Sequence, residues 1–285
     1  MSTAMISGWK GDAMIKFKRL AVLAALAVAA AVPAVAGASE GGVRLDRSPN
    51  EVKDVASLQA GARNFVNYCL GCHSASMMRY NRLRDIGLTE TQIKDNLLFT
   101  ADKVGELMNN GMTRKDAKEW FGAAPPDLSV IARSRGADWL YTYMRTFYRD
   151  PASATGWNNM VFDRVGMPHV LWSLQGQSVL DVKEFKTHEQ AEAALMQAKS
   201  FSVVEESGEG ASKKYLVKTI RVETPGAMTP VEYNVFVRDL VNFLVWMGEP
   251  AQLVRKQIGI VVLFFLALLI LLTWLLKKEF WKDVH

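Results

Sequence analysis

Two cysteines and a histidine form the most distinctive chemical motif of this 285-residue chain. Cys69 and Cys72 are its only cysteines, and His73 directly follows the second. Residues three apart on a helical turn share one face, so both sulfurs can reach one edge of a porphyrin while the next residue turns beneath it. The C-x-x-C-H pattern is typical of covalent haem attachment through two thioether bonds, with the imidazole as an iron ligand. We therefore predict one haem c per chain, attached through Cys69 and Cys72 and ligated by His73.

Three other interpretations of the paired cysteines fit the sequence less well. A disulfide across so short a loop would constrain little of the chain. A thioredoxin-like redox pair is expected beside a strand-helix-strand pattern, which the surrounding sequence does not show. Half of a zinc site would need two further ligands from the three remaining histidines and the acidic residues. A covalent haem, by contrast, uses both thiols and the histidine together.

The second axial position of a haem decides whether the protein carries electrons or reacts with small molecules. Met167 lies between Gly166 and Pro168, which favours an extended loop that presents the sulfur to the iron. A thioether favours ferrous iron and raises the reduction potential. His169 is the alternative ligand, because residues i and i+2 of an extended segment point the same way. Four other methionines are further candidates, although a methionine is more often a core residue than a ligand: Met108, Met112, Met144 and Met160.

An amphipathic helix is expected to deliver the cysteine motif. Ser57 is a suitable N-cap for it, because a side-chain oxygen there can accept a hydrogen bond from the first turn. Apolar positions then recur at helical spacing up to the motif, at Leu58, Ala62, Phe65 and Cys69.

A second helix is predicted near the C-terminal end of the same domain. Thr229 is its expected N-cap, Pro230 its first residue and Glu232 the partner in a capping box, while Gly248 and Pro250 mark its end. Its apolar face is expected to pack on the first helix and consists of Val237, Leu240, Val241 and Leu244.

The region between these helices contains shorter elements. Two short helices are expected after a double proline, the first capped by Asp127 and ended by Gly136, the second running from Trp139 to Tyr148. Residues 191–199 have a helical pattern, and the segments 201–206 and 214–222 predict a β-hairpin around the turn SGEGAS. The expected domain is therefore mainly helical with a small hairpin insertion.

Both ends of the chain contain long apolar segments. Residues 1–38 have the basic, apolar and small-residue regions of a secretory signal peptide. Ile258–Leu276 contains 19 residues without a charge, enough to cross a bilayer as one helix. We therefore expect a periplasmic domain over 39–254, a single transmembrane anchor in the cytoplasmic membrane over 255–278 and a cytoplasmic tail over 279–285.

The formal net charge of +5 does not indicate a nucleic-acid partner. The basic excess lies in the two apolar ends and their flanks, and the predicted periplasmic domain is nearly neutral. Nucleic-acid binding would need a clustered basic face. The membrane is the partner that the sequence indicates.

The order of the motifs resembles that of the cytochrome c1 family, the haem subunit of bacterial cytochrome bc1 complexes. The motifs that carry the resemblance run over residues 44–285. They are Cys69-x-x-Cys72-His73, Pro125-Pro126-Asp127-Leu128-Ser129, Ala132-Arg133-Ser134-Arg135, Gly166-Met167-Pro168, Trp246-Met247-Gly248-Glu249-Pro250 and the terminal span.

The resemblance implies a class I cytochrome c-like fold and specific roles for several residues. It implies Met167 as the axial ligand and an arginine that pairs with a haem propionate, for which Arg135 fits best and Arg133 is the alternative. A planar guanidinium binds such a carboxylate with two hydrogen bonds. Pro126 and Trp139 would pack against the haem. We transfer no role to residues 179–222, where the resemblance is least secure.

The same resemblance implies a place in an electron-transfer chain. The protein would accept electrons from a Rieske iron-sulfur protein and pass them to a soluble periplasmic cytochrome c, within a dimeric complex that also contains cytochrome b. It would be a redox subunit of ubiquinol-cytochrome c reductase and no enzyme on its own. The alternatives are a membrane-anchored c-type cytochrome of another respiratory chain and a haem protein that reacts with gases or peroxide.

Overall fold

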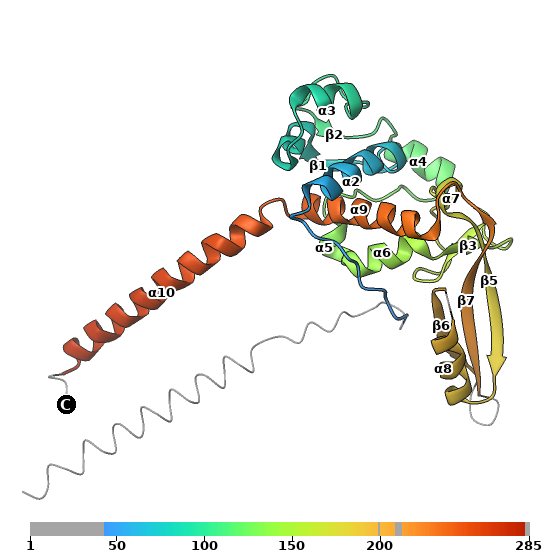
Figure 1. The fold of residues 1–285 in the computed structure, drawn as a ribbon. Helices are drawn as coiled ribbons and strands as arrows, with labels where there is room; N and C mark the ends of the chain where they lie inside the picture. The colour runs from blue at the N-terminus through green and yellow to red at the C-terminus, as the bar shows by residue number, and fades with distance from the viewer. Residues whose placement is uncertain (1–42, 199, 209–212, 283–285) are drawn as a thin grey trace, which may run out of the picture. The chain divides into compact units, whose positions relative to one another are not determined.

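A computed structural model describes residues 43–198, 200–208 and 213–282, which belong to one compact unit of the chain. The predicted signal peptide, residues 1–38, lies outside the described residues. Helices dominate the described part, and its strands form three small antiparallel sheets (Figure 1). The mainly helical fold class predicted from the sequence is confirmed.

Helix α2, Val55–Tyr68, ends directly before the cysteine motif. Its N-cap is Asp54, whose carboxylate accepts a hydrogen bond from the Ser57 amide at 3.0 Å, so the prediction of Ser57 as the cap was wrong. The Ser57 hydroxyl instead donates to the Asp239 carboxylate at 2.7 Å. The predicted apolar face is confirmed, because all four of its members are buried: Leu58, Ala62, Phe65 and Cys69.

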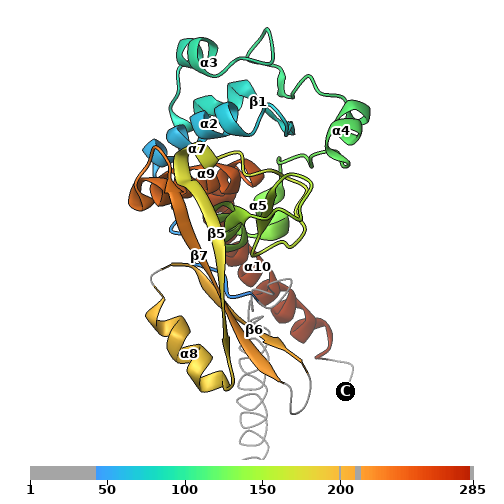
Figure 2. The same cartoon turned by 90° about the vertical axis from the view of Figure 1, so that its right-hand side faces the viewer.

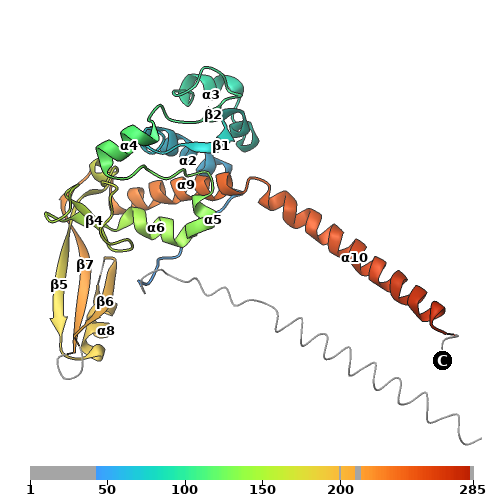
Figure 3. The same cartoon turned by 180° about the vertical axis from the view of Figure 1, so that it is seen from behind.

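Helix α9, Pro230–Gly248, begins and ends where the sequence predicts. The Thr229 hydroxyl accepts a hydrogen bond from the Glu232 amide at 3.3 Å, and the Glu232 carboxylate accepts one from the Thr229 amide at 2.8 Å. This capping box satisfies two amides that have no partner within the helix. Helix α9 lies between α2 on one side and the short helices α5, Ile131–Arg135, and α6, Ala137–Arg145, on the other (Figures 1 and 3).

The contact between α2 and α9 depends on a glycine. A Cβ atom at Gly61 would lie 2.0 Å from the Asp239 carbonyl oxygen and 2.6 Å from the Phe243 Cβ. The two backbones can therefore approach only because residue 61 has no side chain. The Asn242 amide donates to the Ser57 hydroxyl at 3.0 Å and adds a buried polar link across the same contact.

The segment after the cysteine motif forms a small cap of short elements beside α2. Strands β1 and β2 pair antiparallel, and two of the three helices begin at threonine N-caps, Thr89 and Thr113. The elements in chain order are β1, Ala75–Arg79; the 3-10 helix η1, Tyr80–Ile86; α3, Glu90–Asn96; β2, Leu107–Met108; and α4, Arg114–Phe121.

Helices α5 and α6 follow the double proline as predicted, but their ends differ from the prediction. Asp127 does not cap α5, because its carboxylate bonds to other backbone amides. Gly136 separates the helices at a φ of 88°, a conformation that glycine adopts without strain. Helix α6 ends at Arg145, three residues before the predicted end, because Phe147–Arg149 forms strand β3 and pairs with β4, Trp157–Asn159.

The predicted hairpin is confirmed as part of a larger sheet. Strands β6, Ser202–Ser207, and β7, Lys214–Pro225, pair antiparallel, and β5, Gly176–Phe185, pairs with the other edge of β7. The sheet order is therefore β5-β7-β6. Helix α8, His188–Gln197, confirms the helical pattern of its residues and contacts all three strands (Figures 1 and 2). Strand β5 was missed, because its pairing partner lies about 40 residues away along the chain.

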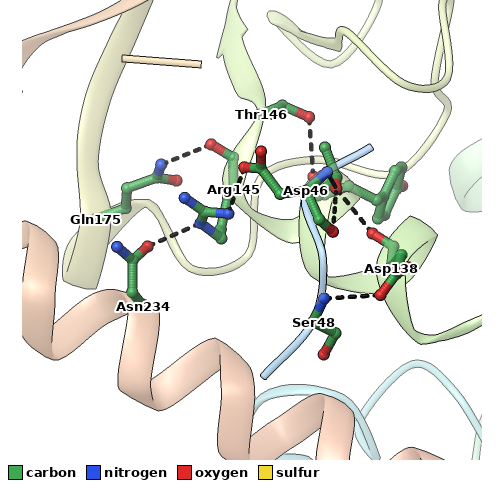
Figure 4. Close-up of polar contacts among 9 residues, drawn as sticks. Asp46, Ser48, Asp138, Arg145, Thr146, Gln175 and Asn234 are labelled. Atoms are coloured by element: carbon green, nitrogen blue, oxygen red, sulfur yellow. Dashed lines mark hydrogen bonds and ion pairs between the residues drawn. The ribbon is translucent and has the colours of Figure 1, made fainter. Parts of the chain in front are cut away.

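A polar cluster ties the N-terminal segment to the helices (Figure 4). The Arg145 guanidinium contacts the Asp46 carboxylate at 2.7 Å and donates to the Asn234 side-chain oxygen at 2.7 Å. Gln175, the last residue of helix α7, Trp172–Gln175, donates to the Arg145 carbonyl at 3.0 Å. One arginine at the end of α6 thus joins three separate segments.

Helix α10, Gln252–Phe280, contains the predicted anchor. Its 29 residues include an 18-residue window with a mean hydropathy of 3.0, and none of that window is buried in protein. By length and composition it is a candidate for one membrane-spanning helix. Among the described residues, the apolar side chains of α10 are exposed along its length, as expected for a helix whose surroundings are a membrane or a partner.

Candidate haem site

The cysteine motif continues the helical path of α2 by one turn. Cys69 is the C-cap of α2, and its carbonyl accepts hydrogen bonds from the amides of Cys72 at 3.0 Å and His73 at 2.8 Å. Cys69 is buried and Cys72 is exposed. Burial, with a smaller contribution from Cys72, raises the pKa of the Cys69 thiol to about 12, so the free thiol is protonated at neutral pH. The turn keeps the two sulfurs and the imidazole close together in the chain.

The His73 imidazole has a defined orientation. Its Nδ1 atom lies 2.8 Å from the Pro126 carbonyl oxygen, and because a carbonyl can only accept, Nδ1 carries the hydrogen. The Nε2 atom then has a free lone pair, the arrangement that a metal-binding histidine needs. Burial lowers the pKa of His73, and the hydrogen bond to Pro126 only partly opposes this. The imidazole is therefore neutral at neutral pH and able to bind iron.

Residues 126–129 are fastened to the segment that follows the cysteine motif, and we call the two segments, 73–77 and 126–129, the histidine clamp. The Asp127 carboxylate accepts hydrogen bonds from the amides of Ser76 and Ser129, both at 2.8 Å. The Ser129 hydroxyl accepts one from the Met77 amide at 3.0 Å. Burial raises the pKa of Asp127, but the hydrogen bonds together outweigh it and hold the pKa below its usual value. The clamp fixes the carbonyl that orients His73.

Pro126 thus acts through its backbone, and its side chain is exposed. The sequence resemblance implied packing of its ring against haem, which remains a prediction. The carbonyl contact to His73 was not predicted from the sequence, since the two residues are 53 positions apart.

Met167 lies on a loop that is fastened to helix α6. Its side chain is partly buried, and its Sδ atom accepts a hydrogen bond from the Tyr143 hydroxyl at 3.5 Å. The buried Asn159 side chain donates to the Tyr143 carbonyl at 2.8 Å and accepts from the Val161 amide at 2.9 Å. The loop that carries Met167 is therefore anchored at its start to the same helix that contacts the sulfur.

His169, the alternative ligand, packs differently from Met167. Its ring is buried, stacks on Phe147 at 4.9 Å between ring centroids, and meets the edge of Trp157 at 5.1 Å. Burial lowers the pKa of His169 to about 4, and the neighbouring Gln175 side chain opposes only part of this shift. In this structure His169 is an aromatic core residue, while Met167 lies beside Tyr143.

Arg135 and Trp139 lie together next to this loop. The Arg135 guanidinium carbon is 5.2 Å from the centroid of the Trp139 ring and 6.0 Å from that of Phe162. Trp139 in turn stacks on Tyr143, with 4.7 Å between centroids and 12° between planes. A connected series of contacts therefore runs from Arg135 through two aromatic rings to Met167.

Arg133, the alternative to Arg135, occupies another position. It is exposed, and its stem covers Gly248 at the end of α9, where an added Cβ would lie 3.3 Å from the arginine Cγ. Of the two arginines, Arg135 is the one that contacts Trp139.

Two residues of this region were missed in the sequence. Tyr143 is one of several aromatic residues in α6, and nothing in its spacing distinguishes it. Asn159 follows another asparagine, and two adjacent buried amides are unusual, since buried polar groups require partners. The adjacent asparagines indicate a buried hydrogen-bonding position, but the sequence does not reveal which loop they hold.

A cleft of about 570 Å³ lies elsewhere, beside the polar cluster of Figure 4. None of the residues predicted for the haem site lines it. Its walls include Arg44, Arg145, Phe201, Ile220, Tyr233 and Asn234.

Comparison with known proteins places the chain in a family. A model of the cytochrome C1 family matches residues 47–192 and 224–284. The chain is 44% identical over 249 residues to cytochrome c1 of Allochromatium vinosum, covering 87% of this chain and 93% of that protein. It is 27% identical over 287 residues to cytochrome c1 of Rhodospirillum rubrum, covering 92% and 96%. It is also 48% identical over 272 residues to a Nitrosomonas europaea protein named ammonia monooxygenase gamma subunit, covering 95% and 99%.

Two thiols one turn apart, an imidazole with a free Nε2 and a thioether on a fastened loop suit the covalent haem of a c-type cytochrome. The family match runs through α2, the histidine clamp, α9 and α10. The chain belongs to the cytochrome c1 family. It is an electron-transfer haem subunit of a bc1-type complex and carries haem c, and the name of the Nitrosomonas relative describes that protein alone.

Proposed function

We propose that this chain accepts electrons from a Rieske iron-sulfur protein and passes them to a soluble periplasmic cytochrome c or a similar carrier. Cys69 and Cys72 would hold the haem, with His73 and Met167 as axial ligands. When bound, the haem supplies one-electron redox chemistry. The observation that carries the proposal is the hydrogen bond from His73 Nδ1 to the Pro126 carbonyl, because it leaves Nε2 free for iron.

The residues around Met167 support a stable six-coordinate iron. A sulfur ligand favours ferrous iron, as suits a carrier late in a respiratory chain. Arg135 would pair with a haem propionate, since its guanidinium already lies against Trp139, which would form part of the haem wall. The position of Arg133 against Gly248 makes it the weaker candidate for that pairing.

The arrangement in the membrane follows from the two ends of the chain. Export through the signal peptide, 1–38, would place the domain over 39–254 in the periplasm, with the anchor over 255–278 and a cytoplasmic tail over 279–285. We propose cytochrome b and the Rieske protein as partners in a dimeric complex. Quinol oxidation would belong to those partners, and this chain would only relay electrons.

Purification of the tagged chain from solubilised membranes tests the proposal. We expect cytochrome b and a Rieske subunit to co-purify, and the colour to stay with the polypeptide in acidified acetone, because thioether bonds survive that treatment. We also expect the reduced protein to bind carbon monoxide only slowly, since a held sulfur blocks the sixth position.

Other outcomes would indicate the alternatives. A red protein that never co-purifies with either partner would be a carrier for another respiratory chain. Rapid binding of carbon monoxide would indicate an open iron and a protein that reacts with gases. Haem that is fully extracted by acidified acetone would contradict attachment through Cys69 and Cys72.

A further inference from the structure

We propose that Tyr143 tunes the axial sulfur: its hydroxyl donates a hydrogen bond to Met167 Sδ and thereby raises the reduction potential of the haem. The contact is present in the structure at 3.5 Å. This inference rests on the proposed function, because it requires Met167 to be an iron ligand. It assigns to Tyr143 a positioning and tuning role for a group that it does not itself ligate.

The tyrosine ring is held on two sides. Trp139 stacks on it, with 4.7 Å between ring centroids and 12° between the planes. Phe147 packs against it in a T-shaped arrangement, with 5.0 Å between centroids and 69° between the planes. The ring is 8% exposed, so it has little room to turn away from the sulfur. The direction of the hydroxyl is therefore set by core packing rather than by the weak bond to sulfur itself.

The sulfur is held relative to the same helix. Asn159 is 1% exposed and donates to the backbone carbonyl of Tyr143 at 2.8 Å, while its side-chain oxygen accepts from the amides of Val161 at 2.9 Å and Phe162 at 3.3 Å. Donor and acceptor are thus fastened to one another through the backbone as well as through the hydroxyl. Such support is what a tuned ligand requires.

The Tyr143 hydroxyl bonds to the Met167 sulfur and to no other described residue. A tyrosine phenol carries an O–H hydrogen at neutral pH and can therefore donate to the sulfur. A buried hydroxyl that lost this partner would be left unsatisfied, which is unfavourable.

The effect on the iron follows from electron density. A hydrogen bond to a sulfur lone pair draws density away from the sulfur, which then donates less to the metal. Ferric iron is the more electron-poor state, so weaker donation from the sulfur destabilises it more than it destabilises ferrous iron. The ferrous state is therefore favoured, and the reduction potential rises.

Redox titration of Tyr143→Phe tests the inference, because this variant keeps the aromatic ring and removes only the hydroxyl. We expect the ratio of ferrous to ferric protein at a fixed ambient potential to fall roughly two- to tenfold, where tenfold corresponds to about 59 mV for one electron. Tyr141→Phe is the matched control, since Tyr141 is a buried tyrosine of the same helix that lies against Arg145 at 4.4 Å. The potential of the control should equal that of the native protein.

The far-red absorption band of sulfur-ligated ferric haem separates failure of this inference from failure of the proposed function. If the native protein shows the band and Met167→Leu loses it, Met167 is the ligand. An unchanged potential in Tyr143→Phe would then overturn the tuning role alone. If Met167→Leu keeps the band, the ligand assignment fails and the tuning role fails with it.

A measurement on the native chain keeps the inference testable if Tyr143→Phe does not assemble. In the reduced-minus-oxidised infrared difference spectrum, we expect a tyrosine band that shifts on isotopic labelling of the tyrosine ring, because the phenol senses the charge on the ligated sulfur. The band should persist in Tyr141→Phe. A difference spectrum without any label-sensitive tyrosine band would contradict the proposal.

Discussion

The same side chain has opposite uses at two positions of this protein. His73 and His169 are both neutral, because burial lowers the pKa of each. His73 has a hydrogen bond that fixes one ring nitrogen and leaves the other free, whereas His169 stacks on Phe147 within an aromatic core. What qualifies a histidine as a metal ligand is therefore the partner of its second nitrogen, and burial alone does not provide it.

We predict that His169 makes the protein less stable in mild acid. Its pKa is about 4 in the folded protein against 6.5 when exposed, so only the unfolded chain binds the proton between these values. Stability is unaffected above pH 6.5 and falls as the pH drops toward 4, by about 3 kcal/mol in total. Denaturant unfolding of the full chain in detergent measures this loss. Between pH 7 and pH 5, the free energy of unfolding should fall by about 2 kcal/mol less in His169→Phe than in the native protein.

The measurement compares how the free energy of unfolding changes with pH in the two proteins. Any effect of the larger phenylalanine ring that does not depend on pH therefore cancels. The far-red band should be unchanged in His169→Phe, because a phenylalanine ring can keep the packing on Phe147 and Trp157. Identical pH dependence in the two proteins would show that His169 is not buried as a neutral group.

At the scale of elements, the site depends on how closely α2 and α9 pack. The two helices are far apart in the sequence and meet at Gly61, where the Asp239 carbonyl leaves no space for a side chain. Buried polar links reinforce the same contact, among them the Ser57 hydroxyl bonded to the Asp239 carboxylate. Since α2 ends at the cysteine motif, its placement also sets the position of the two thiols.

We predict that Gly61→Ala lowers the thermal unfolding temperature. The added Cβ would lie 2.0 Å from a backbone oxygen, so α2 and α9 would have to separate, at a cost of about 1–3 kcal/mol. Circular dichroism at helix wavelengths measures the change. Gly105→Ala is the control, because nothing lies within 4 Å of a Cβ at that position. Equal unfolding temperatures for the two variants would mean that the helices do not pack as closely as described.

At the scale of the whole molecule, helix α10 differs from the two long core helices, α2 and α9, in having no buried side chain. Its apolar side chains are exposed along its length, while those of α2 and α9 form the core. An apolar surface of this size is stable only in a membrane or against a partner.

We predict that a chain ending after Ala251 is released from the membrane. Without α10 the domain should remain in the supernatant after cell disruption and ultracentrifugation, because the remaining core is closed by α2, α6 and α9. Its absorption spectrum should match that of the full-length protein prepared in parallel, since every proposed haem residue precedes residue 251. A truncated protein that still sediments with membranes would show that another surface binds them.

Much of the fold could be predicted because its signals are local. The capping box of α9, the apolar face of α2, the hairpin and the charge-free span each depend on residues that lie close together in the sequence. Strand β5 and the cap at Asp54 were not predicted correctly, because a strand edge and a helix start are decided by distant partners as well as by nearby residues. The short length of α6 has the same cause, since β3 pairs with β4 and ends the helix.

For the site, the sequence by itself determined the chemistry: two thiols and an imidazole at the spacing that a covalent haem needs, and an anchor long enough to span a bilayer. The tertiary structure alone decided the orientation, namely the Pro126 carbonyl against His73, the Asp127 carboxylate on the Ser76 amide, and the Tyr143 hydroxyl on Met167. The physical reason is range. Covalent motifs and helical periods act over a few residues, whereas these hydrogen bonds join positions 24 to 53 residues apart and exist only once the core has packed.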